Sequence, residues 1–120
     1  LKAAWRRNLL PMNKSDSHWS VVLTTTDSET LADTIAAALI EAQLAACVSI
    51  FPIRSVYSWQ GQIHKNGEWQ LLIKTRKSQF KAVSEKVRSL HTYDTPELIA
   101  LPIEQGSADY LNWMDEIIKA

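Results

Sequence analysis

His91, Asp94 and Glu97 are the best candidates for a metal site in this sequence. A neutral imidazole suits Cu(II), Zn or Ni, and the two carboxylates follow it closely along the chain. No second histidine stands at ligand spacing. The alternative is a histidine that ends a helix, where the helix dipole favours it.

Cys47 is the one cysteine among 120 residues, so an internal disulfide is excluded. A lone thiol fits a reducing compartment, and we expect a cytoplasmic protein. Because Cys47 follows two alanines at the start of a strand, it is expected to be a small buried hydrophobe rather than a nucleophile. As a metal ligand it would join His91 and Glu97.

A second set of residues combines aromatic rings with one cation and one carboxylate. A cleft between subunits that is lined by such side chains would suit a small anionic or zwitterionic ligand. The alternative is subunit packing, because aromatic side chains anchor interfaces and a lysine extends its charged end to water. The set consists of Tyr57, Trp59, Glu68, Lys74, Tyr93 and Trp113, with His91 beside it.

The remaining composition favours no enzyme class. The isolated glycines Gly61, Gly67 and Gly106 form no phosphate-binding loop, and the sequence has no nucleophile elbow or zinc-binding cysteine pair. Thirteen acidic residues balance thirteen basic ones, so no general attraction to nucleic acid or anionic membranes is expected. No apolar run is long enough to span a bilayer. We therefore expect a non-enzymatic protein that requires no cofactor. Copper or another divalent metal is the one ion to consider as a ligand.

A long hairpin, Ala46–Thr75 with a break at Gln60–Gln62, is the element that must position these residues. Its arms are rich in β-branched and aromatic residues. An arm of about a dozen residues spans ~40 Å, about twice the usual strand. The far end should therefore project and pair with another chain, which predicts an obligate oligomer. Pro52 predicts an edge or a bulge, and Asn66-Gly67 predicts a second turn.

The other elements flank this hairpin. Their order predicts an α+β, ferredoxin-like split βαβ fold with two helices on one face of a four-stranded antiparallel sheet and an extra C-terminal helix. The domain should cover residues 18–120. Residues 1–17 should be a disordered or non-native extension, with Met12 as an alternative start. The predicted elements are a strand at Trp19–Thr25, a helix capped by Thr26 and Glu29 that ends near Gln43-Leu44, a helix capped by Ser78, a strand at Glu97–Ile103 and a helix at Ala108–Lys119.

Several stretches resemble the CutA family of divalent-cation tolerance proteins in order and spacing. The resemblance implies a tight homotrimer similar to that of the PII signalling proteins, with long hairpins wrapping around neighbours. It also implies a link to copper and other divalent-metal tolerance, without an assigned reaction. The stretches are Leu44–Ile50, Ser55–Ile63, Leu72–Thr75, His91–Ile103 and Tyr110–Trp113.

Two positions depart from the family pattern. Some copper-binding members carry a cysteine where this chain has Thr24, a much poorer ligand for Cu(I). The usual His-Pro-Tyr-Glu is His91-Thr92-Tyr93-Asp94 here, which changes how His91 is presented. Three hypotheses remain: a trimeric binding or signalling module, a direct copper- or zinc-binding protein, and a stable trimeric scaffold for partner proteins.

Overall fold

Four strands pair side by side, all antiparallel, in the order β2-β3-β1-β4. The computed structural model describes residues 17–120, and in this part the predicted α+β split βαβ order is confirmed. The predicted extension lies outside the described residues except for Ser17, whose hydroxyl donates to the Ile103 carbonyl. The elements are β1 (Trp19–Thr26), α2 (Glu29–Glu41), β2 (Cys47–Trp59), β3 (Gln62–Arg76), the short 3-10 helix η2 (Lys77–Gln79), α3 (Phe80–Leu90), β4 (Ile99–Ile103) and α4 (Ala108–Ile117).

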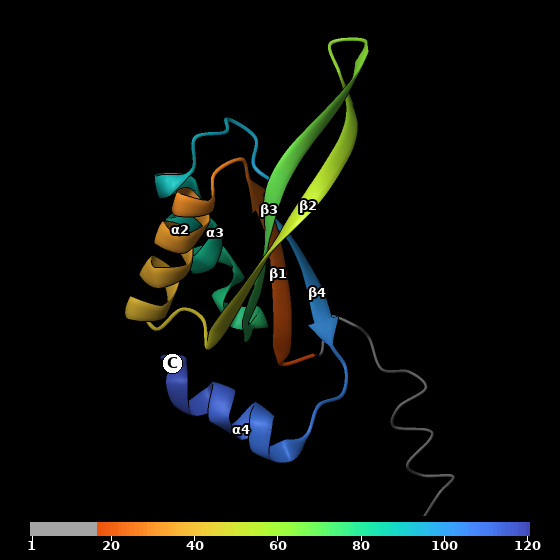
Figure 1. Ribbon diagram of the computed structural model, residues 1–120. Coiled ribbons are helices and arrows are strands. Elements are labelled where there is room, and N and C mark those ends of the chain that lie inside the picture. Colours follow the sequence, from red (N-terminus) through yellow and green to blue (C-terminus); the bar gives the residue numbers. More distant parts are fainter. Residues whose placement is uncertain (1–16) are drawn as a thin grey trace, which may run out of the picture.

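Helices α2 and α3 cover one face of this sheet (Figure 1). The core forms between them and the strands, because alternate residues of β1 and β3 point toward the helices. The fully buried members of this core are Val22, Ala32, Ile35, Leu39, Ala45, Leu71, Ile73, Val83 and Val87.

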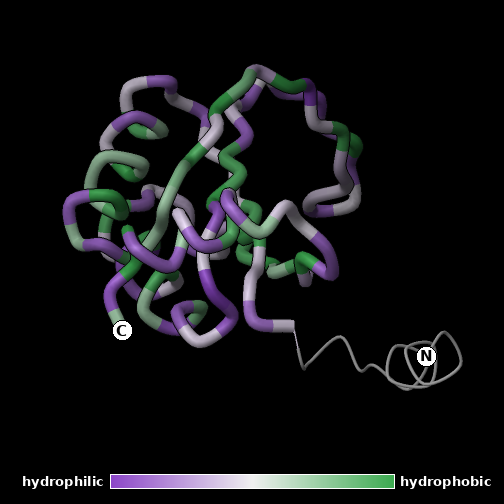
Figure 2. Tube along the Cα trace, turned by 90° about the horizontal axis from the view of Figure 1, so that it is seen from below, coloured by the Kyte–Doolittle hydropathy of each residue, from purple (hydrophilic) through white to green (hydrophobic). Residues whose placement is uncertain are grey.

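The hairpin of β2 and β3 is regular from end to end. Its register runs without interruption from Cys47 opposite Lys74 to Trp59 opposite Gln62. Gln60 and Gly61 make the turn with φ of 51° and 76°, as a two-residue hairpin turn requires. The distal half stands beyond the helices (Figure 1). Figure 2, seen from below, shows hydrophobic and hydrophilic stretches alternating along it.

Two predictions about the hairpin need correction. Asn66 and Gly67 are not a turn, because they pair with Ser55 and Arg54 inside the ladder. Pro52 lies on an edge strand, as predicted, but it pairs with Trp69 in unbroken register and no bulge forms. An edge strand accepts proline because one side of its backbone has no partner strand.

Helix and strand ends also differ slightly from the sequence-based predictions. Ser28, not Thr26, caps α2 by accepting a hydrogen bond from the Leu31 amide at 3.1 Å. Ser78 lies within η2, and α3 begins at Phe80 without a side-chain cap. Strand β4 begins at Ile99 rather than Glu97 because the preceding residues form a loop. Helix α2 ends at Glu41 and α4 at Ile117, each a little earlier than predicted.

Helix α4 lies across the lower end of the sheet (Figure 1). Met114 and Ile118 pack with Ala46 in a small second core. Arg76, at the end of β3, donates to the Asp115 carboxylate at 2.8 Å and to the backbone oxygens of Asp115, Ile118 and Lys119. One arginine therefore ties the last turn of α4 to the sheet. No helix among residues 17–120 is long and apolar enough to cross a membrane.

Thr24 is fully buried on the helix-covered face of β1, and its hydroxyl has no hydrogen-bond partner among the described residues. Replacing Thr24 by valine is expected to raise the free energy of unfolding by about 1 kcal/mol, because a methyl group replaces an unpaired hydroxyl of similar size. Denaturant unfolding measures the change. Thr24→Ser keeps the hydroxyl, loses the methyl and should be destabilising. A less stable valine variant would mean that the hydroxyl has a partner.

Candidate functional site

His91 lies where the loop after α3 crosses the end of β1. The His91 Nε2 donates to the Thr25 carbonyl at 2.7 Å, since a carbonyl oxygen only accepts. The Tyr93 amide donates to His91 Nδ1 at 3.0 Å. Both ring nitrogens are therefore engaged with the backbone, and His91 can bind a metal only after one of these bonds is broken.

Tyr93 continues this network toward β3. Its hydroxyl donates to a carboxylate oxygen of Glu68 at 2.8 Å, one residue beyond the last β1–β3 pair. Burial raises the pKa of the Tyr93 phenol well above its usual range, and the bond to Glu68 and that carboxylate's charge add to the effect. Tyr93 therefore stays protonated and keeps its donor role. Glu97 accepts from Gln70 Nε2 at 3.2 Å and fixes the other end of the loop.

Tyr93→Phe is expected to lower the free energy of unfolding by about 1–3 kcal/mol, because it leaves the buried Glu68 carboxylate without this donor. Urea unfolding measures the loss. Glu68→Gln is the companion variant. Its amide oxygen still accepts a hydrogen bond from the Tyr93 phenol, and the substitution removes the charge of the carboxylate. It should therefore cost less than Tyr93→Phe, and the opposite order would contradict this account of the network.

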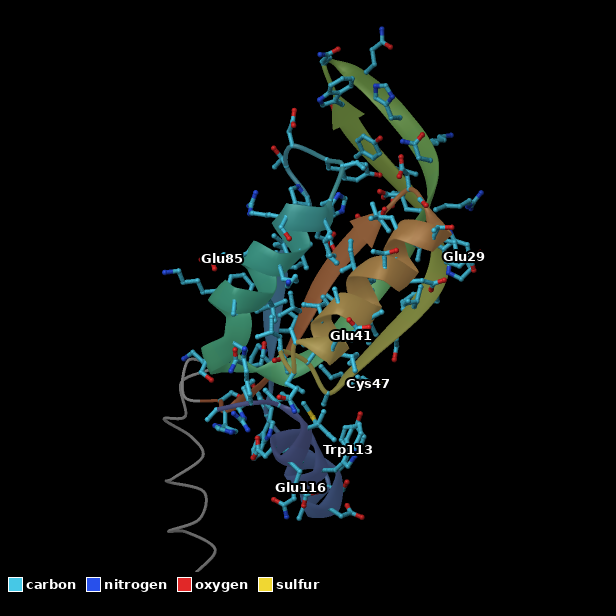
Figure 3. The ribbon with its side chains drawn as sticks, turned by 90° about the vertical axis from the view of Figure 1, so that its left-hand side faces the viewer. Glu29, Glu41, Cys47, Glu85, Trp113 and Glu116 are labelled. Carbon is cyan, nitrogen blue, oxygen red and sulfur yellow. The ribbon has the colours of Figure 1, made fainter. Side chains whose placement is uncertain are left out.

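A second group lies at the α4 end of the sheet. Cys47 and Lys74 face each other across the β2–β3 ladder, and Cys47 is partly exposed rather than fully buried as predicted. The Lys74 ammonium lies 6.0 Å from the centre of the Tyr110 ring. The centres of the Tyr110 and Trp113 rings are 5.5 Å apart. Figure 3 shows Cys47 and Trp113 at this end of the molecule. The group offers a cation, a thiol and two half-exposed rings.

A third group lies on the distal hairpin. Tyr57 stacks on His64 with ring centres 5.6 Å apart, and Trp59 meets the same imidazole edge-on at 5.7 Å. The Asn66 amide donates to the Tyr57 hydroxyl. Trp59 is 58% exposed, so this aromatic surface has no cover within the described part of the chain.

The sheet face away from α2 and α3, called the open face below, connects these groups. Residues directly opposite each other on neighbouring strands share a face. Lys74, Cys47, Tyr57 and Trp59 therefore all lie on the open face of the ribbon. The apolar residues of the open face include Val21, Leu23, Phe51, Leu72, Ile99 and Leu101. Ile99 and Leu101 are half-exposed, at 50% and 51%.

One copy of the chain does not bring the proposed ligand residues together. Lys74 and Trp59 lie at opposite ends of the hairpin, ~40 Å apart at strand rise, so no small ligand contacts both. Among the described residues, no three His, Cys, Asp or Glu side chains form a group that holds a metal. His91, Glu97 and Cys47 thus do not converge within one chain. Thr25, Gln70 and Tyr110 contact the predicted residues from distant elements, and no local sequence signal marks them as part of the site.

The fold and these surfaces define an α+β domain with a four-stranded antiparallel sheet, an uncovered apolar face and a projecting ribbon. Residues 20–117 match the model of the CutA1 divalent ion tolerance protein family, and the chain belongs to that family. The CutA resemblance inferred from the sequence is confirmed.

Relatives and solved structures agree with this assignment. The divalent-cation tolerance protein CutA of Thermus thermophilus is 48% identical over 97 residues, which are 80% of this chain and 94% of that protein. A CutA homolog of Xenopus laevis is 45% identical, with 82% of this chain and 66% of the longer frog protein covered. The Thermus thermophilus Cut A1 structure superposes with a TM-score of 0.82 at 46% identity, covering 84% of this chain and 99% of that one. The Archaeoglobus fulgidus structure, titled a periplasmic divalent cation tolerance protein CutA, gives 0.83 at 40% identity, with 84% and 99% covered.

Proposed function

We propose that this chain acts in divalent metal-ion tolerance, copper included, as a non-enzymatic homotrimer with ligand or metal sites in the clefts between copies. The names of its relatives support the role in metal tolerance. The observation that carries the assembly is the open face. Half-exposed Ile99 and Leu101 continue a patch of apolar side chains of the kind that soluble monomers rarely expose.

The arrangement of the aromatic groups supports sites between copies. Tyr57 and Trp59 project on the hairpin, whereas Lys74 and Trp113 lie at the base of the sheet. The hairpin of one copy is expected to reach the base of a neighbour, which would join rings, cation and carboxylate in one cleft. A small anionic or zwitterionic molecule fits such a lining.

Native mass spectrometry of protein purified from cells tests both parts of this proposal. The expected result is a species of three times the chain mass that retains an ion or a small molecule. A stable monomer at micromolar concentration would refute the assembly, and a trimer that retains nothing would argue against occupied clefts.

Direct copper or zinc binding through His91, Glu97 and Cys47 stays a prediction, as do the scaffold role and the cytoplasmic location. Calorimetric titration with Cu(II) compares wild type with His91→Ala, and His64→Ala is the control histidine. Because both His91 nitrogens hold backbone groups, binding through His91 requires one of these bonds to break. If His91 is a ligand, His91→Ala should bind the metal more weakly than wild type and His64→Ala, and equal affinities in all three proteins would remove His91 from the site.

A further inference from the structure

The hairpin face opposite Tyr57 and Trp59 carries a hollow of about 230 Å³, beyond the edge of the helices. Register places Arg54 opposite Gly67 and Val56 opposite Lys65, so these four residues share that face. Asn66 completes the lining. The hollow lies on the continuation of the helix-covered face, so it stays accessible when another copy covers the open face.

The charge of this hollow is one-sided. Arg54 and Lys65 are exposed, and neither forms an ion pair with a carboxylate of residues 17–120. An arginine offers a planar fork that matches a carboxylate or phosphate group, and a lysine adds a compact positive charge. Two unpaired cations on one short stretch of ribbon therefore favour an anion.

Apart from Asn66, whose side-chain amide donates to the Tyr57 hydroxyl, the rest of the lining is apolar or bare. Gly67 has no atom within 4 Å of the place where a Cβ would stand, so the backbone opposite Arg54 is open to contact. Val56 is 63% exposed and forms an apolar wall. The volume is below the roughly 300–1,000 Å³ of drug-sized sites, so the occupant is small.

We propose that this hollow binds a small organic oxyanion, either a phosphate monoester or a carboxylate, with a short apolar or planar body. Arg54 and Lys65 hold the charged group, and Val56 and the Gly67 backbone contact the body. The site lies within one hairpin, so it does not depend on the proposed clefts or on their ligand.

Titration of the full chain with phenyl phosphate, benzoate and inorganic phosphate, followed by amide NMR, tests the proposal. Saturable shifts centred on Val56, Lys65 and Gly67 are expected for at least one of the aromatic probes, and the stronger probe identifies the charged group. Inorganic phosphate should bind more weakly than phenyl phosphate. Shifts spread over the whole surface, or equal binding of inorganic phosphate, would overturn the proposal.

Two variants separate binding from folding. Arg54→Gln should weaken binding about tenfold, the size expected for a lost charged hydrogen bond, whereas Arg88→Gln on α3 removes an equal exposed charge and should change nothing. Gly67→Val fills the hollow where a Cβ meets no atom, and valine suits a strand better than glycine. It should abolish binding without lowering the melting temperature. Binding unchanged in Gly67→Val would overturn the proposal.

Discussion

Ile99→Glu is expected to convert the proposed trimer into folded monomers. Ile99 lies on the open face opposite Leu23, in a row that continues to Leu72 and Ser49, with no basic side chain among these cross-strand partners. Its side chain is half-exposed in one copy, so the monomer tolerates a carboxylate there. In an interface the same carboxylate would be buried unpaired, at a cost of roughly 3–5 kcal/mol. That corresponds to about a thousandfold weaker association.

Ile40→Glu is the matched control, because Ile40 is 38% exposed on α2, away from the open face. Light scattering should give the wild-type mass for Ile40→Glu and the single-chain mass for Ile99→Glu. Circular dichroism checks that both remain folded. An Ile99→Glu variant that keeps the wild-type mass would remove the open face from the interface.

The hairpin was predictable because both arms and the Gln60-Gly61 turn carry strong local signals. Asn66-Gly67 carries an equally strong local signal for a turn, yet it lies in the ladder. The reason is that the residues on both sides of it already pair with β2 in one continuous register. A turn there would pair the two halves of β3 with each other, and β2 would lose its partners in the ladder. Local turn chemistry was overridden by the pairing of the whole ribbon.

The candidate site was less predictable, because its contacts join distant parts of the chain. The sequence singled out His91 as an imidazole near carboxylates, but it could not place the Thr25 carbonyl against Nε2. The contact between Lys74 and Tyr110 likewise depends on where α4 packs. Residue types on the hairpin can be read from the sequence, whereas the contacts that their side chains make depend on the packing of distant elements.

Arg76→Met is expected to free the end of α4 and lower the free energy of unfolding by about 3 kcal/mol. Arg76 is mostly buried and donates hydrogen bonds to the Asp115 carboxylate and to three backbone oxygens. The substitution removes all of these hydrogen bonds at once. Hydrogen exchange of the α4 amides, together with urea unfolding, measures the effect. Lys77→Met is the control, because it removes a neighbouring exposed positive charge that forms no ion pair among the described residues. Equal effects of the two variants would contradict a specific role for Arg76.

The pH dependence of this difference separates the ion pair from simple packing. The bond from Arg76 holds the pKa of the Asp115 carboxyl below its usual range, with His18 adding to the effect. A carboxyl whose pKa is lowered by folding stabilises the protein above its unfolded pKa of about 4, and that contribution is lost as the pH falls through the lowered value. The gap between wild type and Arg76→Met should therefore be constant near neutrality and shrink below about pH 4. Because Asp115 is one-third exposed, the decrease at low pH should be a minor part of the total stability difference between wild type and Arg76→Met. The hydrogen bonds from Arg76 to the backbone oxygens should account for the rest of that difference.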